Sequence, residues 1–172
     1  MKACSFFGHR DTSQTDGLKV KVREVVERLI IEEGVDTFLF GSRSKFDELC
    51  HVVVTELKEN YPHIRRIAYL CRHESACLVG KGAEEQRCLK EIAGQDICIR
   101  EFEEIKKSDR INSAGRASYL ERNQWMIDDS KVVLFYIMSR ESQRRFSSGS
   151  ELALKYAYRR KKNCIELNVI RL

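Results

Sequence analysis

Three short segments of this sequence combine glycine with serine or basic side chains. They are Gly8-His9-Arg10, Gly41-Ser42-Arg43-Ser44 and Ser147-Ser148-Gly149-Ser150. Glycine lets a backbone turn sharply and approach a ligand closely, and the N–H groups and hydroxyls of a small-residue loop that opens a helix bind anions. Arg10 adds a planar guanidinium that fits a phosphate or a carboxylate. These segments therefore predict a binding site for an anionic ligand.

Titratable side chains lie in or beside the same segments. His9 is of the residue type that serves as an acid or a base in catalysis, while Asp47 and Glu151 are carboxylates that would stabilise an oxocarbenium-like centre. Each segment also has an ordinary structural interpretation: residues 8–10 as a tight turn, and Ser44 or Asp47 as a helix cap. The segment after residue 41 does not match the P-loop pattern. The residues alone leave these interpretations open.

The elements that must position these residues follow from hydrophobic periodicity. Short apolar runs alternate with longer segments whose apolar residues recur every three or four positions, with Gly34 and Pro62 as helix-ending residues. The expected strands span 3–7, 37–40, 66–70, 96–102, 131–138 and 164–169. The expected helices span about 20–30, 46–60, 83–92, 117–128 and 151–160, and the polar residues 103–115 predict a loop.

Alternation of strands and helices with continuously apolar strands predicts an α/β fold, a Rossmann-like parallel sheet with helices on both faces. Ligands of such sheets bind in the crevice beyond the carboxyl ends of the strands. All three small-residue segments fall directly after a predicted strand or at the start of the helix that follows one. No repeat or linker interrupts the 172 residues, so we expect a single domain over 1–172.

Composition limits the class of protein. No apolar run approaches the roughly 20 residues of a membrane helix, and the amino terminus lacks the apolar region of a secretory signal, so we expect a cytoplasmic protein. The 31 basic and 26 acidic residues give a net charge of +5, which favours a phosphate-bearing partner but is too small to indicate nucleic acid. The basic runs 144–145 and 159–162 are interpreted as solvated ends of elements.

The seven cysteines are odd in number and form no C-x-x-C pair. This pattern predicts free, mostly buried thiols in a reducing compartment rather than a zinc site. We expect no metal and no resident cofactor. The segment from Cys71 to Gly82 follows a predicted strand, but its spacing matches no common metal motif and it receives no role.

Four segments in register resemble the SLOG superfamily, which includes the LOG, DprA and YpsA-like proteins, and are most similar to the YpsA-like branch. The resemblance covers nearly the whole chain and implies a Rossmann-like fold with a pocket for a nucleotide-type ligand. The matching segments are Gly8-His9-Arg10, Gly41 through Phe46-Asp47 to Tyr61-Pro62, Arg122-Asn123-Gln124-Trp125-Met126, and Ser148-Gly149-Ser150 with Lys155-Tyr156-Ala157.

The sequence departs from this pattern at informative positions. LOG-type enzymes, which cleave the base from a nucleoside monophosphate, carry P-G-G-x-G-T-x-x-E. Ala153 stands where that glutamate belongs, and Glu151 lies two positions away on a different face of the helix. Ser150 replaces the threonine but keeps a hydroxyl. The resemblance therefore does not carry LOG-type hydrolysis over to this chain.

The first functional hypothesis is a non-catalytic sensor or carrier that binds a nucleotide or nucleotide-derived molecule. Glycines would allow close approach of the backbone, serines would bind phosphate or ribose, arginines would neutralise charge, and Asp47 or Asn123 would bind ribose hydroxyls or base edges. The expected ligand-binding residues are Gly8, His9, Arg10, Gly41, Ser42, Asp47, Arg122, Asn123, Ser148, Gly149 and Ser150.

Two alternatives remain beside it. A nucleotide N-glycosidic hydrolase or transferase would use Asp47 and Glu151 as carboxylates and His9 as the acid. A single-stranded nucleic-acid-binding module, by analogy with the DprA branch, would need basic residues on one face, whereas the charges look scattered along the sequence. Nucleic acid is therefore the less expected partner. The resemblance further implies a homo-oligomer.

Overall fold

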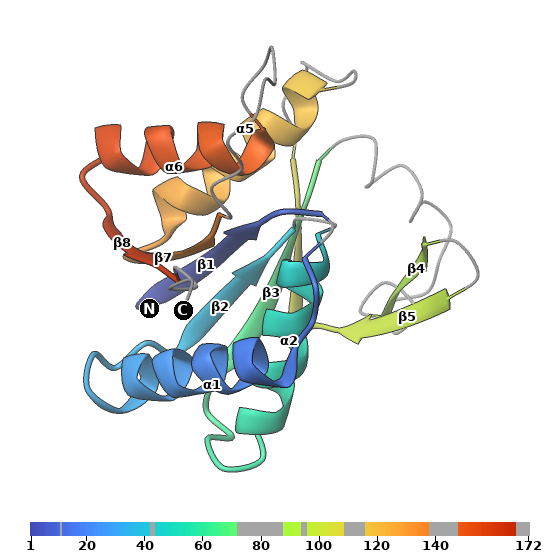
Figure 1. The fold of residues 1–172 in the computed structure, drawn as a ribbon, viewed down its shortest axis with the longest axis vertical. Coiled ribbons are helices and arrows are strands. Elements are labelled where there is room, and N and C mark those ends of the chain that lie inside the picture. The colour runs from blue at the N-terminus through green and yellow to red at the C-terminus, as the bar shows by residue number, and fades with distance from the viewer. Residues whose placement is uncertain are drawn as a thin grey trace.

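The computed structural model describes residues 1–10, 12–41, 44–71, 88–93, 96–108, 116–137 and 148–167. Its centre is a six-stranded parallel sheet (Figure 1). In spatial order the strands are β6 (Glu104–Lys107), β3 (Arg65–Leu70), β2 (Thr37–Phe40), β1 (Ala3–Gly8), β7 (Val132–Tyr136) and β8 (Asn163–Glu166). The predicted parallel sheet is confirmed.

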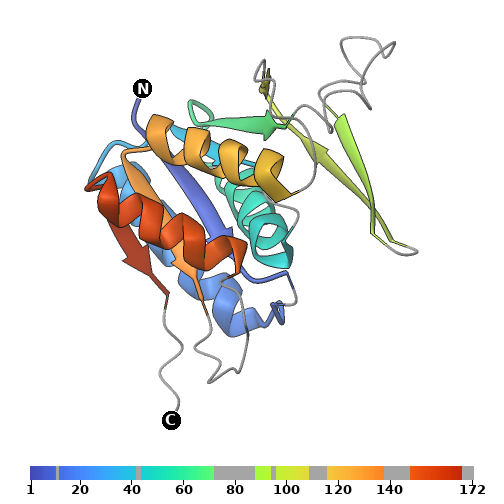
Figure 2. The same cartoon turned by 90° about the horizontal axis from the view of Figure 1, so that it is seen from above.

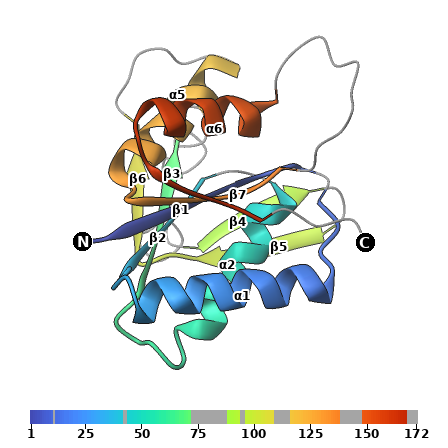
Figure 3. The ribbon, with the colours of Figure 1, turned by 60° about the vertical axis from the view of Figure 1, so that its left-hand side comes forward.

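Two helices cover each face of the sheet, as Figure 3 shows. Helices α1 (Asp16–Ile31) and α2 (Lys45–Leu57) lie on one face, and α5 (Arg116–Asp129) and α6 (Gly149–Arg159) lie on the other. The inner strands β1 (Ala3–Gly8), β2 (Thr37–Phe40) and β7 (Val132–Tyr136) are largely apolar on both faces because both faces of the sheet are covered. In β1, Cys4 and Phe6 join the core under α1 and α2, whereas Ala3 and Phe7 join the core under α5 and α6.

The described helix starts are fixed by side-chain caps. Thr15, Ser44 and Ser148 each accept a hydrogen bond from the backbone N–H three residues later, at the starts of α1, α2 and α6. Such a bond satisfies one of the amide groups that a helix leaves open in its first turn. After α1, Gly34 has a φ of +64°, a conformation that favours glycine.

The order of the strands reverses beside β1. The chain runs outward from β1 through β2 and β3 to β6, and then returns through α5 to β7, on the opposite side of β1. The connection that follows β1 leads to β2 on one side of this strand, and the connection through α5 leads to β7 on its other side. The carboxyl ends of β1 and β7 therefore flank the point where the strand order reverses. In open parallel sheets this point leaves a crevice that ligands occupy.

Two predictions between β3 and α5 are wrong. Residues 88–92, expected in a helix, belong to strand β4 (Cys88–Ala93), which pairs antiparallel with β5 (Asp96–Glu101). Apolar residues at positions 89 and 92 fit a helical spacing. The six residue pairs between β4 and β5 nevertheless show that the segment is one strand of a hairpin. Residues 104–107, expected in a loop, form β6 and pair with β3. This strand is polar because it lies at the sheet edge and is only half-buried.

The hairpin of β4 and β5 projects from the body of the protein (Figure 2). Its base is fixed at Glu101 and Phe102. A ring nitrogen of His51, Nε2, lies 2.9 Å from the carbonyl oxygen of Glu101. The buried ring of Phe102 packs against Phe40 and His51, with centroid distances of 5.9 and 4.9 Å. One aromatic cluster therefore joins the hairpin to β2 and α2.

Candidate functional site

A hydrogen bond joins the end of β1 to the start of α6. The hydroxyl of Ser150 donates to the carbonyl oxygen of Gly8 at 2.8 Å, across 142 residues of sequence. Gly8 pairs with Tyr136, the last residue of β7. The structure therefore brings the first and third small-residue segments together at the point where the strand order reverses.

The first turn of α6 is a capping box. The Ser148 hydroxyl accepts from the Glu151 N–H at 3.2 Å, and Oε2 of Glu151 accepts from the Ser148 N–H at 2.7 Å. Both side chains, predicted to meet a ligand or a substrate, thus cap the backbone. Gly149 and Ser150 are the first two residues of α6, and the N–H groups of a helix's first turn have no partner within the helix. These two amides are the remaining donors of the turn.

The two glycines at this end of the molecule differ in what surrounds them. A Cβ added to Gly8 would lie 2.5 Å from Cβ of Phe46, so this glycine is required for packing against the start of α2. Phe46 in turn stacks on Tyr136 with a centroid distance of 5.4 Å. A Cβ added to Gly149 would meet no described atom within 4 Å. Open space therefore lies beside the first residue of α6.

Gly41, directly after β2, allows helix α5 to lie against the sheet. A Cβ at this position would lie 2.7 Å from the carbonyl oxygen of Tyr69, 2.8 Å from Sδ of Met126 and 3.1 Å from Cδ of Arg122. Only a residue without a side chain fits this space. The contact places Arg122 at the carboxyl end of β2, beside the end of β1.

Arg122 and Asn123 form a buried polar pair on α5. The Arg122 residue is 4% exposed, and its Nη2 donates to Oδ1 of Asn123 at 3.3 Å. Its guanidinium carbon lies 5.3 Å from the centroid of the Tyr119 ring, a cation–π distance. A buried guanidinium is unusual for a helix that covers a sheet. Sequence reasoning selected Arg122 but missed Tyr119, one helical turn earlier.

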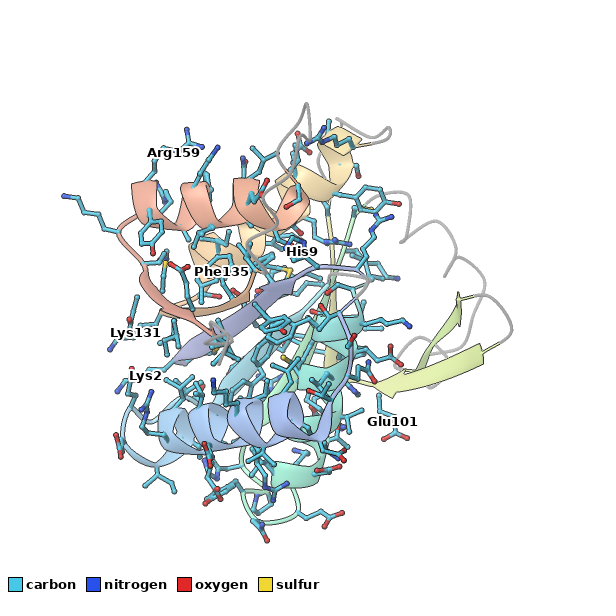
Figure 4. The ribbon with its side chains drawn as sticks, in the orientation of Figure 1. Lys2, His9, Glu101, Lys131, Phe135 and Arg159 are labelled. Carbon is cyan, nitrogen blue, oxygen red and sulfur yellow. The ribbon has the colours of Figure 1, made fainter. Side chains whose placement is uncertain are left out.

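The loop after β1 is tied to the start of α2. The N–H of Lys45 donates to the carbonyl oxygen of Arg10 at 3.3 Å, and the Thr12 hydroxyl donates to the carbonyl oxygen of His9 at 2.8 Å. The His9 side chain is half-buried at the end of β1 (Figure 4), and Arg10 is exposed. Asp47 is fully buried in the first turn of α2, where its N–H donates to the Ser44 hydroxyl at 3.1 Å.

Other predicted residues fall outside the described part of the chain. These are Ser42, Arg43 and Ser147, together with the segment after Cys71. Cys4, Cys50 and Cys164 carry free thiols. Burial, followed by the nearby charge of Asp47, raises the pKa of Cys50, so this thiol is poorly suited to nucleophilic chemistry.

A polar cluster of Tyr69, Lys106 and Asp129 lies apart from these segments. The Tyr69 hydroxyl donates to Oδ2 of Asp129 at 2.6 Å and accepts from Nζ of Lys106 at 2.9 Å. Burial and the bond to Asp129 raise the pKa of Tyr69. The Tyr69 residue is 0% exposed, and its bonds join β3, β6 and α5.

Within the described residues, no group of three or more histidine, cysteine or acidic side chains is arranged to hold a metal ion. No described helix is long and apolar enough to cross a membrane. No protein family matches the sequence, and no curated protein matches it either.

The structure has a clear relative. It is similar to DNA processing protein A from Helicobacter pylori, in a structure that concerns the single-stranded DNA binding mode of that protein. The TM-score is 0.56 at 19% sequence identity, over 99% of this chain and 66% of that one. This chain therefore spans just under two thirds of the other. At this identity the likeness establishes the Rossmann-like α/β fold.

Proposed function

We propose that this protein binds the phosphate of a nucleotide or nucleotide-derived ligand between the end of β1 and the start of α6. The observation that carries the proposal is the bond from the Ser150 hydroxyl to the Gly8 carbonyl oxygen. This bond holds the first turn of a helix at the reversal point of a parallel sheet. That position combines the crevice of the fold with the positive end of a helix dipole.

The local groups favour an anion but limit its charge. The N–H groups of Gly149 and Ser150 lie in the first turn of α6, and the space beside Gly149 is open. Glu151 places a carboxylate in the same turn, bonded to the Ser148 N–H. This negative charge opposes an anionic ligand. Arg10, exposed in the loop after β1, is the cation that we propose offsets it.

The remaining ligand contacts are proposed from the end of β2. Arg122 and Asn123 lie there because Gly41 lets α5 approach. Their guanidinium and amide groups suit ribose hydroxyls or the edge of a base. Ser42, adjacent to Gly41 in sequence, belongs to the same proposed set. We propose a sensor or carrier role, related to the YpsA-like branch.

An N-glycosidic hydrolase or transferase receives less support. Ala153, at the position of the LOG-type glutamate, is buried in the core under α6. Glu151 is engaged as a cap, which leaves Asp47 and His9 as the proposed acid–base groups. Release of free base from a nucleoside monophosphate, lost on Asp47→Asn, is the result that would revive this alternative.

The second candidate is binding of single-stranded nucleic acid. The observation that favours it is the structural likeness to a protein whose single-stranded DNA binding mode has been described. A nucleic-acid phosphate would use the same amides at the start of α6. The affinity for a nucleic acid would depend strongly on salt concentration, which distinguishes it from the affinity for a mononucleotide.

The test is a thermal-shift screen against nucleoside phosphates, ADP-ribose and oligothymidylate. A ligand at a hundredfold its Kd stabilises the fold by about 2.7 kcal/mol, a shift of several degrees for a domain of this size. Gly149→Leu fills the open space beside α6 and is expected to abolish the shift. Gly17→Leu is the matched control, because Gly17 also lies in the first turn of a helix with open space around it. No shift with any compound would refute the proposal.

We further propose that residues 1–172 act as a single domain, that the chain forms a homo-oligomer and that it is cytoplasmic. Light scattering on the purified chain tests the oligomer. A mass equal to the 20.1 kDa monomer at micromolar concentration would contradict it.

A further inference from the structure

Five basic residues lie along the turn from α6 into β8 and at the neighbouring start of β7. Arg159, Arg160, Lys161 and Lys162 follow one another in the sequence. Lys131 joins them because its carbonyl oxygen accepts from the N–H of Asn163, the first residue of β8. Figure 4 shows Lys131 where β7 begins and Arg159 on the outer side of α6. We call these five residues the basic turn.

Few negative charges oppose the basic turn. Oδ1 of Asp128 lies 2.8 Å from Nε of Arg160. Glu166 on β8 is bonded to the Tyr158 hydroxyl. Nζ of Lys162 donates to the backbone carbonyl oxygens of Asp128 and Ser130, at 2.9 and 2.7 Å, which leaves its charge in place. Among the described residues, Arg160 is the member of this set that forms an ion pair with a carboxylate.

The backbone of the basic turn carries an independent signal. The N–H of Lys162 bonds to the carbonyl oxygen of Ala157 at 3.1 Å, and that of Lys161 to Tyr158 at 3.0 Å. This pair of bonds ends a helix with one residue in the left-handed conformation, usually glycine. Lys161 holds that position with a φ of 53°, and it is the non-glycine residue with positive φ among those the structure describes. The chain keeps a charged side chain where glycine would be less strained.

An exposed aromatic ring borders the same surface. Tyr158 is 55% exposed, and the bond from its hydroxyl to Glu166 fixes the orientation of the ring. Oriented aromatic rings beside clustered cations bind the bases and phosphates of single strands. An acidic polypeptide would use the cations but has no need of the ring.

We infer that the basic turn and Tyr158 form a binding surface for single-stranded nucleic acid. The surface lies at the amino ends of β7 and β8, opposite the site proposed at the carboxyl ends. Because β7 spans Val132–Tyr136, roughly 15–20 Å separates the two. The inference is therefore independent of the proposed function.

The experiment measures fluorescence anisotropy of labelled oligothymidylate at low salt with three variants of Lys161. Lys161→Gly and Lys161→Asn remove the charge and suit the left-handed backbone, so both are expected to weaken binding about three- to tenfold. Each should also lower the slope of log K against log salt by about 0.7, the value for one phosphate contact. Lys161→Gly should raise the unfolding temperature by about 2–4 °C, which separates lost binding from lost folding.

Lys161→Arg is the matched variant, because it keeps the charge and the strain and should bind as the unchanged protein does. Lys21→Gln, on α1, controls for net charge and is expected to bind normally. Tyr158→Leu should weaken the binding of oligothymidylate at least fivefold. This factor corresponds to the low end of the free energy of stacking on one base. Equal binding by Lys161→Gly and the unchanged protein would overturn the inference. The inference would also be overturned if the protein bound polyglutamate but not oligothymidylate, and if Tyr158→Leu left the binding of polyglutamate unchanged. That result would indicate an acidic protein partner.

Loss of oligothymidylate binding in Gly149→Leu, with no effect of Lys161→Gly, would place nucleic acid at the carboxyl ends instead. That outcome would refute the inference that the basic turn binds nucleic acid, and it would support the second candidate function. Loss in Lys161→Gly alone, with nucleotide shifts intact, supports the inference and leaves the proposed function standing.

Discussion

Replacing Glu103 by glutamine tests how the segment after the hairpin is held to the sheet. Glu103 accepts from Nε and Nη2 of Arg66 at 3.2 and 2.7 Å and from the Arg66 N–H at 2.6 Å. Breaking a fully buried ion pair by removing one partner costs about 3–5 kcal/mol. The Arg66 side chain is 7% exposed and that of Glu103 is 27% exposed, so water screens part of the pair. We expect Glu103→Gln to cost about 2 kcal/mol.

The neighbouring residue supplies the control. Glu104 bonds to Arg65 at 3.0 Å with side chains that are 39% and 48% exposed. Exposed pairs of this kind contribute about 0–1 kcal/mol. Thermal unfolding of the two variants should therefore differ, with Glu103→Gln lowering the unfolding temperature by about 4–8 °C. Equal effects of Glu103→Gln and Glu104→Gln would refute the argument from burial.

The same pair predicts a dependence on pH. Burial alone would raise the pKa of Glu103, but the hydrogen bonds and charge of Arg66 outweigh it and lower the pKa. A carboxyl group with a lowered pKa stabilises the fold above its unfolded value, near 4.5, and loses that contribution as the pH falls through its folded value. The stability gap between the unchanged protein and Glu103→Gln should narrow in acid. A gap that widens below pH 4.5 would contradict this sign.

Three further predictions concern packing and capping. Gly41→Ala should destabilise the fold by about 1–3 kcal/mol in chemical denaturation, because its Cβ would lie 2.7 Å from a backbone oxygen; an unchanged midpoint would show that α5 shifts freely. Ser148→Ala should cost about 1 kcal/mol through loss of the cap on Glu151, and Ser148→Asp should restore stability in the same assay. Cys4 and Cys50 should react with a thiol reagent only at the rate of unfolding, since burial raises both pKa values; rapid labelling of the native protein would disprove it.

Most of the fold was predictable because its inner strands are largely apolar on both faces. The runs at 3–7 and 37–40 read as buried strands, and the structure has them at Ala3–Gly8 and Thr37–Phe40. Strand β6, with the sequence Glu-Ile-Lys-Lys, gave no such signal because an edge strand is stabilised by pairing with β3 rather than by burial. Its place depends on the ion pair of Arg66 and Glu103, 37 residues apart.

The meeting of Gly8 and Ser150 was predictable from the sequence, but the contacts of the individual side chains were not. Glycines and serines after strands indicated which end of the sheet to consider, and the structure brings Gly8 and Ser150 together there. The roles of individual side chains depend on partners that sequence spacing does not reveal. Gly8 is required by Phe46 on another element, and Gly41 is required by Met126 and Arg122, more than 80 residues later. The capping box of Ser148 and Glu151 follows a local S-x-x-E pattern, yet both side chains were expected to meet a ligand or a substrate instead.

The central position of β1 has a consequence for synthesis of the chain. β1 is made first, yet its second neighbour in the sheet, β7, is made more than 120 residues later. The contact between the hydroxyls of Ser5 and Ser130 spans 125 residues. Until β7 emerges from the ribosome, the unpaired N–H and C=O groups along one edge of β1 remain open to other nascent chains. Chains that end before residue 131 should therefore aggregate during translation, and a chaperone that shields β1 would act until the carboxyl-terminal third has been made.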